Sequence, residues 1–221
     1  NYAPEIDFTE ATSKLKVVVS DGREGKEAIG YVKAYVNMDV ATLNVGSQPL
    51  ANNAHVKYPD AFGMVSLNDL KTYSVDYAIA NEVNAKNVDF KFYCFGASGS
   101  PRLYSMDNTG KDGEFSGSTG KLSAIKVKNL TRFAILSNFD YENATVASIS
   151  SEILSSSIAQ SLLDPIAVGN VIAFRTGGSS AAGGGRIGVM KVINITEPKE
   201  LVSNNATARV MTVEIKFPKK K

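Results

Sequence analysis

The sequence predicts a mostly β, α+β fold in which antiparallel sheets form a sandwich-like body carrying two short helices. Apolar and polar residues alternate over residues 88–95 and 209–217, as expected for strands with one buried face. Residues 170–176 and 186–195 are rich in β-branched residues and flank a Gly/Ser/Ala loop, which is the pattern of a hairpin. The chain has 221 residues, of which 43% are hydrophobic and 21% charged, so it can bury a substantial core.

The first quarter of the chain predicts a separate β segment. Residues 14–20 and 28–36 are expected strands, separated by a turn at Asp21-Gly22. Residues 44–60 contain several Gly, Pro and Asn residues and are expected to form a loop. We therefore expect an N-terminal β segment or small β domain over residues 1–60 and a larger β-rich α+β domain over residues 61–221.

The larger domain is expected to complete a set of seven to nine strands. Ser74 can cap a short helix over residues 74–85, and apolar residues at helical spacing predict a second helix over residues 146–160. Residues 187–195 are apolar on both faces, which indicates a central strand. Further strands are expected at residues 62–67, 122–127 and 132–136, with a polar surface excursion at residues 96–120.

The residue types needed for much of enzyme chemistry are scarce. Cys94 and His55 are the single cysteine and histidine, so an intramolecular disulfide and a multi-histidine metal centre are excluded. Cys94 shares a strand face with Phe90 and Phe92, which predicts a buried, inert thiol. The formal net charge of +2 gives no reason to expect a nucleic-acid partner. No cofactor is predicted, and no apolar run approaches the ~18–20 residues of a membrane span.

The Gly-rich run at residues 183–188 formally matches the G-x-G-x-x-G pattern of dinucleotide-binding proteins. Such a site requires a strand before the run and a helix after it, so that the helix N-terminus meets the pyrophosphate. Here a predicted strand follows the run. We therefore predict a flexible hairpin loop.

One acidic loop is a candidate calcium site. Calcium needs six to eight oxygen ligands, and Asp107, Asp112 and Glu114 could supply some of them. Lys111 falls where a ligand would be expected and adds a repelling charge. The alternative is an ordinary polar turn.

Two tyrosines are candidates for binding a sugar. Tyr93 lies on the strand face opposite Phe92, and Tyr104 lies in the polar excursion that follows. Aromatic rings of this kind can serve as platforms for sugars. The alternative is that they are buried under a helix or a second sheet. Pairs among the 22 acidic residues could also serve a carboxylate-dependent glycoside hydrolase, which needs two carboxylates a few ångströms apart.

Five segments in order resemble an uncharacterised family of exported Bacteroidetes proteins, many of them lipoproteins. They are TYSVDYA at residues 72–78, VDFKF at 88–92, NLTRF at 129–133, GNVIAFR at 169–175 and GVMKVINI at 188–195. The resemblance spans about residues 62–217 and implies a domain of unknown function outside the cytoplasm. The family's lipid-anchoring cysteine is not in this chain, and the loop at residues 177–185 is longer than usual. No functional residue transfers with the resemblance.

The first functional hypothesis is a non-enzymatic binding or accessory protein of the cell surface or periplasm. The resemblance implies a link to glycan uptake and, as partner, a glycan or another surface protein. A membrane contact would come only through a lipid anchor outside this chain. The second hypothesis is a fimbrial-type assembly subunit, in which a terminal strand pairs with a neighbour's sheet. The third is the carboxylate-dependent hydrolase.

Overall fold

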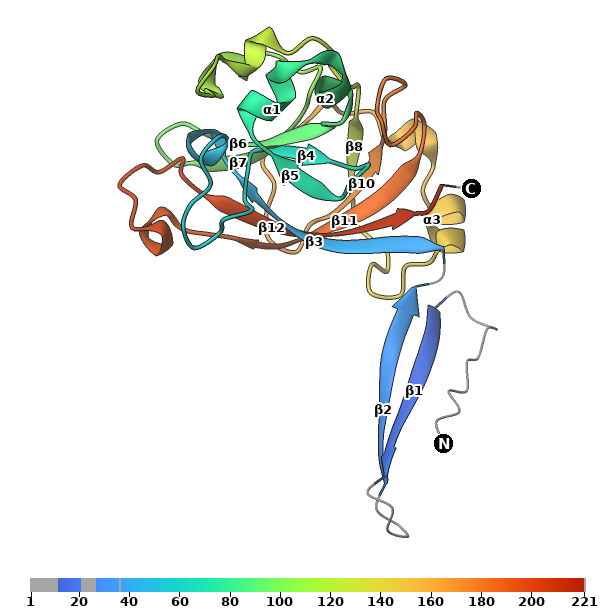
Figure 1. Cartoon of the computed structure of the whole chain (residues 1–221). Coiled ribbons are helices and arrows are strands. Elements are labelled where there is room, and N and C mark those ends of the chain that lie inside the picture. The colour runs from blue at the N-terminus through green and yellow to red at the C-terminus, as the bar shows by residue number, and fades with distance from the viewer. Residues whose placement is uncertain (1–11, 21–26, 36, 221) are drawn as a thin grey trace.

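The computed structural model describes residues 12–20, 27–35 and 37–220, with side chains from residue 37 onward apart from Ser156. Two five-stranded antiparallel sheets form the body (Figure 1). The first has the order β3 (Met38–Gly46), β12 (Val210–Pro218), β11 (Ile187–Ile195), β10 (Val171–Arg175) and β8 (Arg132–Leu136). The second has the order β5 (Lys71–Tyr73), β4 (Met64–Ser66), β6 (Phe90–Phe95), β7 (Ser100–Ser105) and β9 (Leu162–Leu163). The predicted sandwich-like fold is confirmed.

The main core lies between the two sheets. Inward-facing residues of β6, including Phe90, Phe92 and Cys94, meet those of β11 and β12 and are fully buried. Phe90 of one sheet and Phe133 of the other form an edge-to-face pair with ring centroids 5.7 Å apart. Such pairs add to the free energy that burial alone provides.

Helices cover the outer face of each sheet (Figure 1). Helices α1 (Val75–Ala80) and α2 (Glu82–Lys86), with the 3₁₀ turns η2 (Asp112–Glu114) and η3 (Leu122–Ala124), form a second apolar cluster on the second sheet. Helix α3 (Val146–Glu152), followed by the 3₁₀ turn η4 (Ser155–Ser157), forms a third cluster on the first sheet. The described sandwich body therefore has four layers.

The N-terminal strands stand outside these layers. Strands β1 (Thr12–Ser20) and β2 (Glu27–Tyr35) pair antiparallel over nine positions and form a two-stranded sheet of their own. Figure 1 shows this ribbon extending away from the sandwich at the start of β3. Because β3 pairs with β12 from Met38 to Gly46, it belongs to the sandwich. The change in architecture thus lies between β2 and β3, and the expected boundary at residue 60 falls inside the body.

Several local predictions are confirmed. The Ser74 hydroxyl accepts a hydrogen bond from the Tyr77 N–H and caps α1. Strand β11 pairs with β10 on one side and β12 on the other, so it is a central strand. The Gly-rich run is the loop of the β10–β11 hairpin, with Gly183 and Gly185 at φ values of 93° and 74° that favour glycine.

Other predictions are wrong, each because tertiary contacts override local sequence. The helix predicted over residues 74–85 is interrupted at Asn81, whose extended backbone ends α1 and whose side chain caps α2. Residues 122–127 were predicted to form a strand, but they begin with the 3₁₀ turn η3. Leu122 and Ile125, three residues apart, are both buried beneath the helices. The predicted excursion at residues 96–120 contains β7, which pairs with β6 over six positions.

Candidate functional site

The two tyrosines chosen from the sequence are buried. Tyr93 on β6 is 2% exposed and Tyr104 on β7 is 4% exposed. Their rings meet edge to face with centroids 5.5 Å apart, inside the cluster formed with α1 and η3. Burial, together with the hydrogen bond that its hydroxyl donates to Glu114, raises the pKa of Tyr93 above its ordinary value. The burial alternative is therefore the one observed, and these rings form no exposed sugar platform.

The three acidic candidates are each paired with a different cation. Asp107 forms a two-pronged ion pair with the Arg132 guanidinium, both N–O distances being 2.8 Å. Asp112 lies 2.6 Å from the Lys91 ammonium, and Glu114 lies 2.8 Å from Lys111. The structure thus brings the three carboxylates into one loop but directs them to protein cations. Across the described ranges, no group of three or more His, Cys, Asp or Glu residues is arranged to hold a metal ion.

Lys91 is a buried charged residue that was not among the candidates predicted from the sequence. Its side chain is fully buried on β6, and its ammonium donates to the Ser105 and Asn108 carbonyls as well as to Asp112. Burial lowers the pKa of Lys91, and the attraction of Asp112 opposes this effect. The sequence did contain a signal for it, namely a lysine in the middle of the strand predicted at residues 88–95. This ion pair fastens the loop at residues 105–114 onto the second sheet.

A raised carboxyl pKa, one feature of hydrolases, occurs at Asp89. Burial raises the pKa of Asp89 to about 6, and the carboxylate accepts a hydrogen bond of 2.8 Å from the Leu67 N–H. Asp89 is 0% exposed, and the Asn129 amide is 3.5 Å from its second oxygen. A substrate would have to contact the carboxyl directly. Asp89 is instead enclosed by the segments around residues 67, 129 and 180.

This burial predicts a pH-dependent difference between the wild type and Asp89→Asn. A pKa raised in the folded state means that folding is favoured at low pH, and that this contribution disappears as pH rises from about 4 to about 6. The loss amounts to roughly 3 kcal/mol at a conversion of about 1.4 kcal/mol per pKa unit. Urea unfolding at pH 4 to 7.5 should therefore show the variant gaining stability relative to wild type by about this amount. A difference that does not change with pH would show that Asp89 ionises normally.

The remaining reactive residues have structural surroundings. Cys94 is fully buried, and burial raises the pKa of its thiol to about 12, which confirms the prediction of an inert thiol. His55 is half-buried in a loop, where its Nδ1 accepts a hydrogen bond from the Lys57 N–H.

A different site appears at the outer edge of the first sheet. The Phe133 N–H donates to the Gln160 carbonyl at 2.8 Å, and the Gln160 N–H donates back at 3.1 Å. Phe133 thus directs its backbone away from β10. In an antiparallel sheet the direction alternates, so Ile135, two residues on, directs its N–H and C=O to the same free edge. Among the described residues, Ile135 has no such partner.

Beyond this unpaired residue lies a groove with a volume of about 510 Å³. We call it the β8 groove; its walls are Ala134, Ile135, Leu136, Ser137, Asn138 and Phe139 on one side and Glu152, Ile153, Ser157 and Gln160 on the other. Six consecutive residues of one strand and its continuation line it, so it follows the sheet edge. Ile135 is 44% exposed, which is high for an isoleucine in a sheet.

The opposite edge of the same sheet is also free over part of its length. The Gly46 N–H of β3 donates to the Phe62 carbonyl, so Asn44 and Thr42 direct their backbone groups outward by the same alternation. A second cavity there is lined by more polar residues, namely Thr42, Leu43, Asn44, Asp60, Phe62, Lys71 and Thr72. Five of the ten residues that line the β8 groove are apolar, against two of the seven at the β3 edge.

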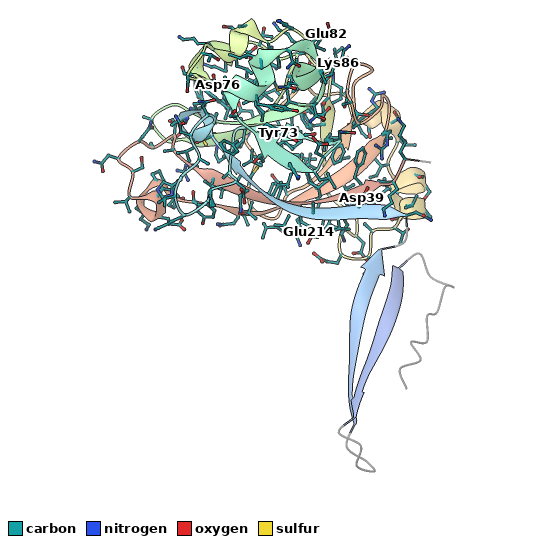
Figure 2. All side chains as sticks on the ribbon, viewed as in Figure 1. Asp39, Tyr73, Asp76, Glu82, Lys86 and Glu214 are labelled. Carbon is teal, nitrogen blue, oxygen red and sulfur yellow. The ribbon has the colours of Figure 1, made fainter. Side chains whose placement is uncertain are left out.

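One aromatic pair lies nearer the surface than Tyr93 and Tyr104. Tyr73 and Tyr77 are half-buried and stack with centroids 4.0 Å apart; Figure 2 marks Tyr73 beside the second sheet. The Tyr73 hydroxyl donates to Asp69 at 2.6 Å, and the Asn87 amide donates to the Tyr77 hydroxyl at 3.1 Å. This combination of stacked rings and converging polar groups could bind a sugar.

No helix within the described segments is both long enough and apolar enough to cross a membrane. No protein-family model matches the sequence, and no curated protein matches it. The fold is similar to the crystal structure of a DUF4466 family protein from Parabacteroides merdae ATCC 43184, a member of the Bacteroidetes, with a TM-score of 0.51 and 14% identity. The similarity covers 94% of this chain and 62% of the neighbour, so this chain spans under two thirds of that protein's length. The chain therefore shares the fold of a protein assigned to a family of unknown function.

Proposed function

We propose that the protein is a non-enzymatic, extracytoplasmic accessory protein that holds an extended segment of a partner protein at the free edge of β8. The observation that carries the proposal is the Ile135 backbone, whose N–H and C=O point out of the sheet into the β8 groove. An extended peptide placed there would continue the pairing that Phe133 makes with Gln160. Strand addition of this kind obtains affinity from main-chain hydrogen bonds and specificity from alternate side chains.

Within the described part of the chain, the β8 edge has no proline, bulge or inward-pointing charge that would prevent such pairing, and Gln160 covers it only at Phe133. Natural edge strands are protected by proline, bulges, inward charges or a covering element. β8 has the sequence RFAIL and a regular register with β10, and its one charge, Arg132, is held by Asp107. Next to it, Leu136, Phe139 and Ile153 provide apolar walls. The edge is thus suited to receive a strand with apolar residues on one face.

The non-enzymatic part of the proposal is supported by where the reactive groups lie. Asp89 and Cys94 are fully buried, and the acidic candidates Asp107, Asp112 and Glu114 are engaged by protein cations. The extracytoplasmic location is supported by the resemblance to exported proteins.

Selection from a displayed library of random peptides tests the proposal. We expect enriched peptides to bind wild type and to lose most of their affinity for Ile135→Pro, which removes the outward N–H without removing a β8–β10 hydrogen bond. Ile135→Val keeps the N–H and should bind nearly as well. Enriched peptides that bind Ile135→Pro as tightly as wild type, or no enrichment at all, would refute the proposal.

Glycan binding is a second candidate, favoured by the Tyr73–Tyr77 stack beside Asp69 and Asn87. If it holds, a glycan array should identify a ligand that raises the melting temperature of wild type and leaves that of Tyr77→Ala unchanged. A ligand that shifts both proteins equally would bind elsewhere. The absence of any ligand on a broad array would remove this candidate.

A further inference from the structure

This inference rests on the function proposed above and concerns the segment that occupies the β8 groove. We propose that the groove receives strand β1 (Thr12–Ser20) of a second copy of the same chain, so that the copies join head to tail. The chain carries both halves of such a contact: an unpaired strand edge on the sandwich and a strand that stands away from it.

Strand β1 has one edge without a partner among the described residues, and this edge is the donor. It pairs with β2 along one edge, and the two strands form a sheet with no third member among the described residues. The ribbon is attached at the start of β3, at the edge of the first sheet opposite β8, and it extends away from the body (Figure 1). A contact between β1 and β8 is therefore one between copies.

The dimensions of donor and acceptor agree. The β8 groove follows six consecutive residues, 134–139, which correspond to about 20 Å of extended chain at roughly 3.3 Å per residue. Strand β1 has nine residues, or about 30 Å on the same scale. The donor is long enough to fill the groove and remain connected to β2.

The residue pattern of β1 also agrees with the groove. Successive residues of a strand alternate between faces, so Leu15, Val17 and Val19 share one face, as the apolar walls of the groove require. β1 contains Lys14 and Lys16 and no acidic residue, whereas the one charged residue lining the groove is Glu152. The charge of Glu152 therefore favours β1 over a segment rich in acidic residues.

Two observations favour the β8 edge over the β3 edge as the acceptor for β1 of the second copy. The cavity beside β3 has fewer apolar residues in its walls, which include Asp60, Lys71 and Thr72. β3 is also the strand from which the copy's own ribbon emerges. Because a donor and an acceptor of different structure meet, the contact is heterologous. The joined pair retains one free β1 strand on one copy and one free β8 groove on the other.

Sedimentation velocity on the full chain tests the inference. We expect wild type to form species larger than the monomer as concentration rises. Ile135→Pro, which disables the groove, and the double variant Leu15→Asp/Val17→Asp, which disables the donor, should each remain monomeric. Mixed together, these two proteins should form a dimer and nothing larger, because one intact donor and one intact groove remain. Formation of that dimer also shows that both variants are folded.

Thr42→Pro is the matched control, since it removes an outward N–H from β3 by the same chemical change. It should assemble as wild type does. Wild type that stays monomeric at all concentrations, oligomers that survive Ile135→Pro, assembly lost in Thr42→Pro, or a mixture that stays monomeric would each overturn the inference. If wild type is monomeric but library peptides still bind at Ile135, the inference fails while the proposed function stands.

Discussion

Replacing Asp112 by alanine is expected to lower the free energy of unfolding by about 3–5 kcal/mol, the usual cost of leaving a buried charge unpaired. The Lys91 ammonium is fully buried and 2.6 Å from Asp112, and the backbone carbonyls that remain beside it carry no counter-charge. Urea unfolding followed by circular dichroism at pH 7 measures this loss. A loss below about 1 kcal/mol would contradict the buried ion pair, since that value is typical of pairs at the surface.

Two further variants distinguish the effect of the unpaired Lys91 charge from the effect of losing the packing of the Asp112 side chain. Lys91→Met combined with Asp112→Ala removes both charges, so the double variant should be more stable than Asp112→Ala alone. Glu82→Ala breaks an exposed ion pair with Lys86 at the same distance of 2.6 Å, on the outer surface of α2 (Figure 2). The unfolding midpoint of Glu82→Ala should remain close to that of wild type, because solvent screens this pair.

Phe133→Ala is expected to cost about 3–5 kcal/mol, in the range observed for removing a buried phenylalanine ring. Phe133 is 0% exposed on β8, and its ring contacts Phe90 of the facing sheet edge to face. The substitution opens a cavity between the sheets and removes that aromatic pair. Denaturant unfolding should show the loss with an unchanged m-value if the body still unfolds as one unit.

Ile135→Ala provides the comparison on the same strand. Ile135 is 44% exposed and faces the β8 groove, so its loss should cost much less than that of Phe133. If both variants lost the same free energy of unfolding, Ile135 would be as buried as Phe133, which contradicts its exposure at the edge of β8. The same variant is useful functionally, since it keeps the backbone N–H while removing an apolar wall of the groove.

The strands that were predicted correctly are those whose signal is local. Residues of β12 alternate between apolar and polar, and β10 and β11 flank a Gly-rich loop, so both the strands and the hairpin could be read from the sequence. Strand β3 was missed because Asn44 and Gly46 resemble a loop. It is a strand because β12 pairs with it over nine positions, more than 160 residues away in the sequence.

The surroundings of the predicted site residues depend even more than the strands on contacts between segments distant in the sequence. Tyr93 was identified on the correct strand face, but its burial is decided by η2 and η3, which fold over β6. Asp112 was considered as a metal ligand, and its partner Lys91 lies 21 residues earlier in the sequence. Neither outcome could be read from the loop itself, because burial and ion pairing depend on which segments meet in space.

The sequence by itself determined the β-rich class, the hairpin, the inert Cys94 and the scarcity of histidine and cysteine. These follow from local alternation and from the residues present. Only the tertiary structure decided which carboxylates are neutralised, which rings are buried and where the sheet is left unpaired. The free edge at Ile135 exists because Gln160 pairs with Phe133 and extends no further along β8. Strand pairing is made between segments far apart in the chain, so its limits are fixed only when the whole chain has folded.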